Sequence, residues 1–313
     1  MSPNNRKIVI TGAAGLVGQN LIQRLIAAGF QDIVAIDKNP HNCEILARLQ
    51  PGVEVVVADL AADKGWENHL RNCAALVVGH AQIGGTASDE FVRNNVLATE
   101  RLLDAARRFD VPYLVNISSS VVNSLAFDNY TETKKTQERL VLSSGIPQVV
   151  LRPTLMFGWF DRKHLGWLAR FMQRTPVFPI PGTGRYMRQP LFAGDFCNVI
   201  VSAIQSRKAG TYNISGREKI DYIDLIHAVR RATASRTPIV RIPYALFWAL
   251  LRANALISSN PPFTTSQLKA LVTPDEFEVI DWPGVFGVRA TPLDDALAET
   301  FRDPKYSAVV LQF

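Results

Sequence analysis

Short, continuously hydrophobic runs alternate with amphipathic stretches along the first half of the chain. Strands of a parallel sheet that is buried on both faces show this continuous pattern, whereas covering helices repeat apolar residues every three or four positions. The pattern predicts strands at 7–11, 32–37, 53–60, 74–81, 113–118 and 148–153. It predicts helices at 16–29, 89–109 and 130–144. Strands and helices in alternation favour an α/β fold with a doubly wound parallel sheet.

The rhythm changes after residue 153. Residues 155–187 are rich in aromatic residues, glycine and proline, and from residue 238 onward the pattern is irregular with short helices. Apolar spacing predicts further helices at 196–206 and 222–233 and a strand at 210–215. We therefore expect residues 1–154 to form the main domain, with 188–216 returning to it. A smaller C-terminal lobe, built from 155–187 and 217–313, is expected to bind the substrate.

The first predicted strand is followed at once by TGAAGLVGQN, in which three glycines recur at equal spacing. Gly12 permits a tight turn, Gly15 lets a pyrophosphate approach the backbone, and Gly18 lets the helix pack close to the sheet. Free N–H groups and the helix dipole favour an anion at the N-terminus of the following helix. A strand, this glycine spacing and a helix, in that order, predict a dinucleotide site of the Rossmann type.

Asp37 ends the second predicted strand, where a carboxylate would accept hydrogen bonds from the ribose of adenosine. The same carboxylate would repel a 2′-phosphate, so NAD is the expected cofactor, while the adjacent Lys38 leaves NADP open. Asp59 ends the third predicted strand and could reach the adenine. Residues 1–154 are therefore predicted to be an NAD-binding Rossmann domain.

A serine-rich strand end precedes a tyrosine–lysine pair that suits proton transfer. Ser119 lies in NISSS, and Tyr130 is followed four positions later by Lys134. Positions i and i+4 share a face of a helix, so the Lys134 ammonium is expected to lower the pKa of the Tyr130 phenol from about 10 towards neutrality. Such a tyrosine exchanges a proton with a hydroxyl group while hydride moves to or from nicotinamide. Lys134 would also hold the nicotinamide ribose, and Ser119 would orient the substrate oxygen.

Together these motifs resemble those of the extended short-chain dehydrogenase/reductase family, in its NAD-dependent epimerase/dehydratase group. The resemblance implies a catalytic triad of Ser119, Tyr130 and Lys134. It also implies substrate contacts from Ser120 and from Arg188, whose guanidinium would hold a nucleotide diphosphate. The cofactor contacts that it implies are Gly12, Gly15, Leu16, Val17, Gly18, Asp37, Asp59, Leu60, Ala81, Asn95, Ser118, Tyr130, Lys134, Arg152 and Pro153.

The resemblance covers about residues 6–216, makes Asn95 a prop for the active site, and implies a homodimer built from helices around 90–109 and 130–144. The leading activity is that of an NAD-dependent epimerase acting at C4 of a nucleotide sugar or a related anionic small molecule. Dehydration is disfavoured because Ser119 is not followed by the Asp-Glu pair of sugar dehydratases. An NAD(P)-dependent 4-keto-sugar reductase and a 3β-hydroxysteroid-type dehydrogenase on an apolar or lipid-linked substrate remain open. The intact triad disfavours a non-catalytic NAD-binding subunit.

The composition limits the kind of ligand and the cellular location that we expect for this protein. Lys and Arg number 34 against 28 Asp and Glu, a net charge of +6 with no basic run, which favours an anionic small molecule over nucleic acid. Cys43, Cys73 and Cys197 lie far apart, so we expect no metal site and a reducing, cytoplasmic location. The opening residues lack a signal-peptide core. The apolar stretch 244–257 is interrupted by Arg252, and core packing, dimer packing or contact with a membrane surface stay open for it.

Overall fold

A seven-stranded parallel sheet forms the centre of the protein, and the computed structural model describes residues 6–85, 87–125, 127–257, 265–272 and 278–312. Its strands are β1 (Lys7–Thr11), β2 (Ile33–Asp37), β3 (Glu54–Val57), β4 (Cys73–Val78), β5 (Leu114–Ile117), β6 (Gln148–Pro153) and β11 (Gly210–Ile214). They lie in the order β11-β6-β5-β4-β1-β2-β3, and all neighbouring pairs are parallel. This order confirms the predicted Rossmann-type, doubly wound α/β fold.

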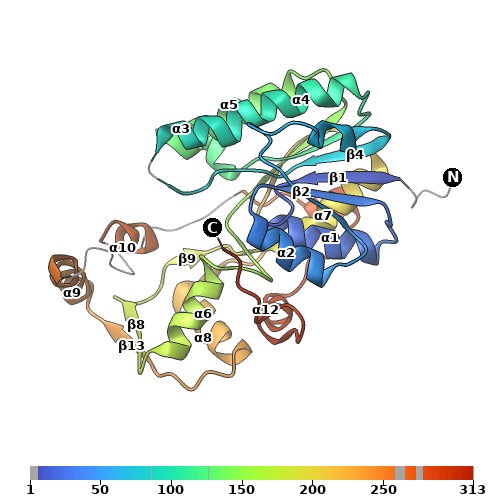
Figure 1. The fold of residues 1–313 in the computed structure, drawn as a ribbon. Coiled ribbons are helices and arrows are strands. Elements are labelled where there is room, and N and C mark those ends of the chain that lie inside the picture. The colour runs from blue at the N-terminus through green and yellow to red at the C-terminus, as the bar shows by residue number, and fades with distance from the viewer. Residues whose placement is uncertain (1–5, 86, 126, 258–264, 273–277, 313) are drawn as a thin grey trace.

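Helices cover both faces of this sheet. They are α1 (Leu16–Ala27), α2 (Pro40–Leu49), η1 (Trp66–Leu70), α3 (Ser88–Phe91), η2 (Val92–Leu97), α4 (Ala98–Arg108), η3 (Ser120–Asn123), α5 (Asn129–Leu142) and α7 (Ala193–Ser206). Ile8 and Ile10 of β1 enter a core with α1 and α7, whereas Val9 enters a core with α4 and α5. Figure 1 shows α4 and α5 over one face and α1 and α7 over the other. Successive strand residues point to opposite faces, so a sheet covered on both sides requires continuously apolar strands.

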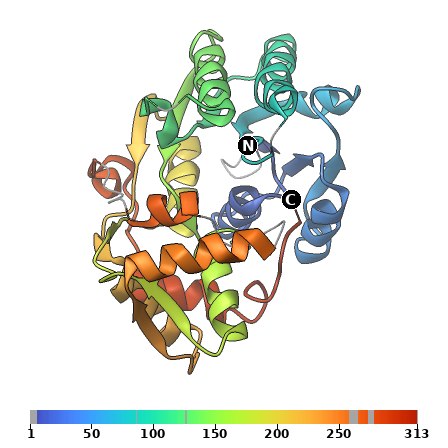
Figure 2. The same ribbon diagram turned by 90° about the vertical axis from the view of Figure 1, so that its left-hand side faces the viewer.

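The C-terminal lobe packs beside the carboxyl ends of the strands. It contains β7 (Met156–Phe157), α6 (Leu165–Arg174), β8 (Phe178–Pro181), β9 (Met187–Arg188), β10 (Leu191–Phe192), β12 (Ile220–Asp221), α8 (Tyr222–Ala232), β13 (Ile239–Ile242), α9 (Tyr244–Ile257), α10 (Thr265–Val272) and α12 (Leu293–Arg302). Its apolar core joins α6, α8 and α12. The short helix α11 (Trp282–Phe286), expected in the lobe, instead buries Trp282 and Phe286 in the core of the sheet beside α7. Figures 1 and 2 place α9 at the outer end of the lobe, away from the sheet. Within the described ranges, no helix has both the length and the hydrophobicity needed to cross a bilayer.

Two helices, α2 and α6, lie where the sequence pattern predicts none. The Asn39 side chain accepts a 3.0 Å hydrogen bond from the backbone N–H of Asn42, and Pro40 occupies the first position of α2. At α6, the Asp161 carboxylate accepts from the backbone N–H groups of His164, at 2.9 Å, and of Gly166, also at 2.9 Å. Both helices are therefore initiated by side chains that accept from free N–H groups at the helix start.

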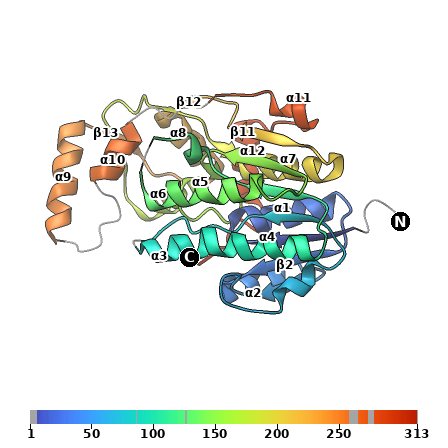
Figure 3. The same ribbon diagram turned by 90° about the horizontal axis from the view of Figure 1, so that it is seen from above.

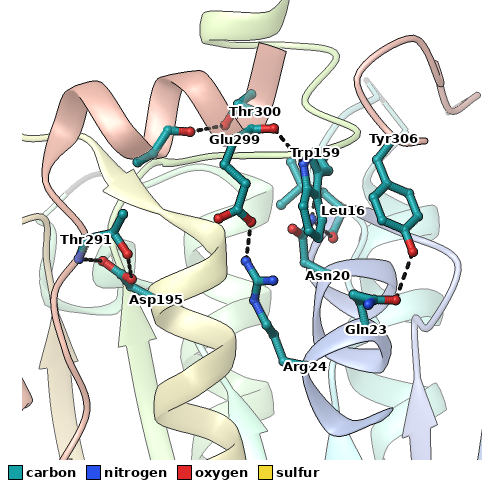
Figure 4. A network of polar contacts seen from close by, with 11 residues as sticks. Leu16, Asn20, Gln23, Arg24, Trp159, Asp195, Thr291, Glu299, Thr300 and Tyr306 are labelled. Carbon is teal, nitrogen blue, oxygen red and sulfur yellow. Dashed lines mark hydrogen bonds and ion pairs between the residues drawn. The ribbon is translucent and has the colours of Figure 1, made fainter. Parts of the chain in front are cut away.

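The C-terminal segment fastens the lobe to α1, as Figure 4 shows. Glu299 of α12 forms an ion pair with Arg24, and its backbone oxygen accepts a 2.8 Å hydrogen bond from Trp159 Nε1. Tyr306 donates from its hydroxyl to Gln23 Oε1 at 2.8 Å. These contacts join residues from opposite ends of the chain, so they hold the lobe in a defined position against the glycine-rich turn.

Candidate active site

Packing of the turn between β1 and α1 accounts for two of its three glycines. Gly12 has a φ of 66°, and a Cβ there would lie 2.6 Å from the carbonyl oxygen of Gly79. A Cβ on Gly18 would lie 2.4 Å from the carbonyl oxygen of Ala13. A Cβ on Gly15 would lie 3.3 Å from the backbone oxygen of Gly12, a tight contact but a less severe one than at Gly12 or Gly18. Gly15 caps α1 with no side-chain bond from the described residues, which leaves room and free N–H groups for a pyrophosphate.

Asp37 is held rigidly beside this turn. Its Oδ2 accepts a 3.0 Å hydrogen bond from the backbone N–H of Ala14, and its Oδ1 accepts one of 3.0 Å from Asn39. Burial raises the pKa of the Asp37 carboxyl, while these backbone bonds and the Lys38 ammonium oppose the rise. A cavity of about 90 Å³ is lined by Gly12, Ile36, Asp37, Lys38, Ala58, Asp59, Leu60, His80, Ala81, Gln82, Asn94 and Ala98. The structure thus brings five of the predicted cofactor residues to one cleft, where the Asp37 carboxylate can accept hydrogen bonds from the hydroxyl groups of an adenosine ribose.

Ser119 and Tyr130 meet above the carboxyl end of β5. The Ser119 hydroxyl lies near enough to the Tyr130 phenol to influence its pKa, and the Tyr130 ring is partly buried. Burial raises the pKa of the Tyr130 phenol, the Ser119 hydroxyl opposes the rise, and the Asp128 carboxylate adds to it. The expectation that Lys134 lowers this pKa is wrong for the protein as it stands. The reason is that the phenol loses solvent on folding, while the Lys134 ammonium is directed elsewhere.

Lys134 lies inside the protein below the tyrosine. Its side chain is 1% exposed, and Nζ donates to the backbone oxygen of Ile117 at 3.0 Å and to Gln137 Oε1. Burial lowers the pKa of Lys134 to about 8, and the nearby Glu138 carboxylate limits the fall. An ammonium with this pKa is close to its charge transition at neutral pH, as the lysine of a proton-transfer site requires.

A buried polar network continues from Lys134 to β1. Gln137 donates to Thr99 Oγ1 at 2.9 Å, and His80 lies between Thr99 Oγ1 at 3.0 Å and Thr11 Oγ1 at 2.9 Å. Burial, with smaller contributions from the Lys134 and Lys38 charges, lowers the pKa of His80 to about 3. His80 is therefore neutral, so it supports the lysine through hydrogen bonds without adding a charge.

Asn95 anchors the loop after β4 to α5. It lies in η2, a π-helical segment that interrupts the helix predicted over 89–109. Its Oδ1 accepts from the backbone N–H of Gln82 at 2.6 Å, and its Nδ2 donates to Thr133 Oγ1 at 3.0 Å. Asn95 is fully buried, so its geometry is that of a prop between two segments.

Glu138 joins two residues that the sequence assigned to the cofactor. Arg152 donates from Nε to Glu138 Oε2 at 3.0 Å and forms an ion pair with the other carboxylate oxygen, and Ser118 donates to Glu138 from its hydroxyl. Burial opposes ionisation of Glu138, but the Arg152 and Ser118 bonds outweigh it and lower the pKa of the carboxyl. Sequence reasoning missed Glu138, although its place four residues after Lys134 on one helix face was a usable signal.

The other predicted residues lie at the same edge of the sheet or in the lobe. Leu16 and Val17 open α1, Ser120 opens η3, and Pro153 ends β6. Arg188 lies in β9, where it donates to the backbone oxygen of Met187 at 2.8 Å and to that of Leu271.

Arg188 also lines a cavity of about 1130 Å³ inside the lobe. The residues that line it are Leu155, Arg162, Lys163, His164, Leu165, Trp167, Leu168, Arg170, Phe171, Phe178, Pro179, Pro181, Arg188, Gln189, Pro190, Tyr222, Leu225, Ile242, Phe247, Leu250, Leu251, Asn254 and Leu271. Ser119, Tyr130 and Lys134 are not in this set, and Leu155, directly after β6, is the part of the lining nearest to them along the chain.

Comparison with known protein families shows to which family the chain belongs. Residues 8–215 match the "NAD dependent epimerase/dehydratase family". The chain belongs to this family. Its resemblance to extended short-chain dehydrogenases/reductases and the prediction of NAD as cofactor are thereby confirmed, and the chain is an NAD-dependent enzyme of the oxidoreductase type.

Individual members of the family differ in what they act on. The chain is 27% identical, over 64% of its length and 65% of the relative, to a "4-hydroxy-2-methyl-3-oxo-4-farnesyl-3,4-dihydroquinoline-1-oxide ketoreductase" of Stigmatella aurantiaca. It is 22% identical to a "Ceramide reductase" of Caulobacter vibrioides, over 83% of this chain and 80% of that one. A UDP-glucuronic acid 4-epimerase from Bacillus cereus, solved with NAD, superposes with a TM-score of 0.66 at 23% identity, over 76% of this chain and 87% of that one. At this identity the superposition shows the shared fold.

Proposed function

We propose that this enzyme is an NAD-dependent sugar-nucleotide epimerase that acts at C4, with Tyr130 as its acid and base. The observation that supports this best is the position of the Tyr130 phenol near the Ser119 hydroxyl, on the helix that also carries the buried Lys134. In the first half of the reaction, Tyr130 takes the proton of the C4 hydroxyl as that carbon gives up hydride, and the alcohol becomes a ketone. In the second half, hydride returns to the opposite face and Tyr130 gives the proton back. Bound NAD supplies the hydride acceptor and donor.

The surrounding residues support this role for Tyr130. Ser119 can donate to the substrate oxygen and hold it in line with the phenol. Lys134, whose pKa burial lowers to about 8, donates to the backbone oxygen of Ile117, so it anchors α5, and with it Tyr130, to the end of β5. Glu138 and Arg152 tie α5 to β6, so they keep Tyr130 and Lys134 in register with the strand end that carries Ser119.

A turnover assay with isotope-labelled substrates tests this proposal. UDP-glucose, UDP-N-acetylglucosamine and UDP-glucuronic acid, each deuterated at C4, are incubated with enzyme and NAD, and the 4-epimers are measured by NMR. We expect one epimer to form with its deuterium retained. Tyr130→Phe removes one oxygen and should lower turnover by about 10²–10⁴-fold, with NAD affinity unchanged. Parental turnover in Tyr130→Phe would refute the assignment of the acid and base.

A second candidate is a ketoreductase, which would use the same residues in one direction. Two observations favour it: the apolar cavity of the lobe, and the reductase activities named for the two curated relatives. A reductase consumes one NADH for each ketone reduced, whereas an epimerase consumes none overall. NADH oxidation that depends on an added ketone, without any 4-epimer, would replace the epimerase with this candidate. A 3β-hydroxysteroid-type dehydrogenase would instead reduce NAD to NADH, and this reduction would depend on an added apolar secondary alcohol.

The homodimer through α4 and α5 remains a prediction, as does the cytoplasmic location. Exposed apolar side chains support the dimer, since Val92 and Leu97 of η2 and Leu142 of α5 are 42%, 46% and 47% exposed. Analytical ultracentrifugation of the parent and of Leu97→Glu tests it, and a dimer that persists in Leu97→Glu would count against this surface.

A further inference from the structure

The cavity in the lobe is lined by apolar and aromatic side chains, which suit the binding of an apolar chain. On one side α6 presents Trp167, Leu168 and Phe171, and the rings of Trp167 and Phe171 stack at 5.1 Å. On the other side α9 presents Phe247 and Leu251, one helical turn apart. At about 1130 Å³ the cavity exceeds the volume of about 300–1,000 Å³ that small-molecule sites usually have.

The charged residues of this cavity share one sign. They are Arg162, Lys163, Arg170 and Arg188, and no Asp or Glu occurs among the described lining residues. The nearby Asp161 turns its carboxylate onto the N–H groups that open α6. Arg170 donates to the backbone oxygens of Asp161 and Arg162, at 3.2 Å and 2.6 Å, and these acceptors carry no net charge. Burial lowers the pKa of Arg170 and the Asp161 carboxylate opposes this, so Asp161 offsets part of the positive charge. The described lining still carries four cationic side chains, which suits an anionic group.

The cationic end of the cavity lies towards the catalytic edge of the sheet. A Cβ built on Gly84, in the loop after β4, would lie 3.3 Å from Lys163 Nζ. Leu155, which follows β6 directly, lines the same cavity. An anionic headgroup near Lys163 would thus place its apolar chain between α6 and α9.

The outer face of α9 is apolar as well. Tyr244, Leu246 and Trp248 are 41%, 52% and 44% exposed, and Arg252 is the one charged residue among positions 244–254. Figures 2 and 3 show α9 at the outer end of the molecule. A helix that is apolar on all sides is normally buried. Trp and Tyr beside leucines on an exposed helix suit the boundary between water and lipid.

We propose that this enzyme also acts on an anionic amphiphile, whose apolar chain fills the lobe cavity and enters past α9 from an anionic lipid surface. The inference rests on the proposed function only in that the headgroup carries the secondary alcohol or ketone. A second copy of the chain against α9 would cover Leu246 and Trp248, but it would account neither for the apolar interior nor for its positive charge. The lipid explains all three features.

Binding of dodecyl phosphate below its micelle concentration tests the cavity by calorimetry. We expect it to bind at least about tenfold more tightly than inorganic phosphate, because burying several methylene groups adds affinity. Leu251→Trp and Leu168→Trp should each fill the cavity and weaken binding by about tenfold or more. Leu142→Trp, on the distant α5, is the matched control and should leave binding unchanged. Equal affinity for the two phosphates, or unchanged binding in both cavity variants with NAD affinity intact, would overturn the proposal.

Vesicle flotation tests the outer face of α9. The parent should float with vesicles of phosphatidylcholine and phosphatidylglycerol, and less with phosphatidylcholine alone. Leu246→Glu and Trp248→Glu should lose this binding, whereas Val57→Glu, at a 55% exposed position on β3, should keep it. A parent that stays in solution, or Leu246→Glu and Trp248→Glu variants that change only the oligomeric state, would make α9 a contact between copies and refute the lipid surface.

The two proposals fail in different ways. Tyr130→Phe should still bind dodecyl phosphate and vesicles, since Tyr130 does not line the cavity. Epimerisation of a UDP-sugar by a protein that does not bind dodecyl phosphate would refute the amphiphile and keep the epimerase. Dodecyl phosphate binding without turnover of any UDP-sugar or ketone would refute the epimerase and keep the amphiphile site.

Discussion

Replacing Lys134 with methionine measures what it costs to bury the ammonium group. The side chain is 1% exposed, and burial lowers its pKa from 10.5 to about 8. One pKa unit corresponds to about 1.36 kcal/mol, so keeping this group charged in the folded protein costs roughly 3 kcal/mol at neutral pH. Methionine has a similar length and no charge, so it removes this cost.

The variant also loses two hydrogen bonds. The backbone oxygen of Ile117 and the side-chain oxygen of Gln137 would each lose a donor, at about 1–3 kcal/mol together. At pH 7 the two effects largely offset each other, so Lys134→Met should be at least as stable as the parent. Between pH 8 and 10.5 the unfolded parent keeps a proton that the folded parent releases, so its stability rises with pH in this window. The parent should gain roughly 3 kcal/mol relative to Lys134→Met across it.

Urea unfolding at about pH 7 and about pH 10 measures this change in the stability difference. Lys135→Met is the control, because Lys135 lies on the solvent side of the same helix, paired with Glu132 at 2.9 Å. Its difference from the parent should change by less than about 1 kcal/mol. A Lys134→Met difference that stays constant with pH would refute the depressed pKa. The same variant should bind NAD more weakly and turn over about 10²–10⁴-fold more slowly.

Three further substitutions test the cofactor cleft and its support. Asp37→Ala should relax a preference for NAD over NADP of at least about tenfold, measured by titration of tryptophan fluorescence; equal affinities in the parent would contradict the role of Asp37. Gly12→Ala should lower stability by about 1–3 kcal/mol, and Gly15→Ala should cost less stability than that but weaken NAD binding by about tenfold; a larger loss of stability in Gly15→Ala would show that Gly15 serves packing. Glu138→Gln removes the charged partner of Arg152 and should cost about 3 kcal/mol in urea unfolding; a loss within about 0.5 kcal/mol would mean that solvent replaces the carboxylate.

Much of the cofactor cleft could be predicted from the sequence because its determinants are close together along the chain. Gly12, Gly15 and Gly18 lie within the seven residues that follow a strand, and Asp37 ends the next strand of the same unit. The α2 and α6 helices were missed because each begins at a polar cap, whereas the prediction searched for apolar periodicity. Asn39 before Pro40 is a cap signal that would have located α2.

Burial and long-range partners are what the sequence left open. From the sequence, Arg152 is a residue near the end of a strand and a predicted cofactor contact. In the structure its guanidinium donates a hydrogen bond to Glu138 of α5. His80 reads as a polar residue after β4, but its burial between Thr11 and Thr99 keeps it neutral.

The sequence by itself determined the order of strands and helices, the glycine-rich turn and the spacing of Tyr130 and Lys134, because hydrophobic period and local spacing are properties of neighbouring residues. Only the tertiary structure decided the charge states around them. Desolvation depends on every segment packed against a group, and β4, β5, α4 and α5 converge on Lys134 from distant parts of the chain. The same convergence, between α6 and α9, produced an apolar and positive cavity that no single stretch of the sequence contains.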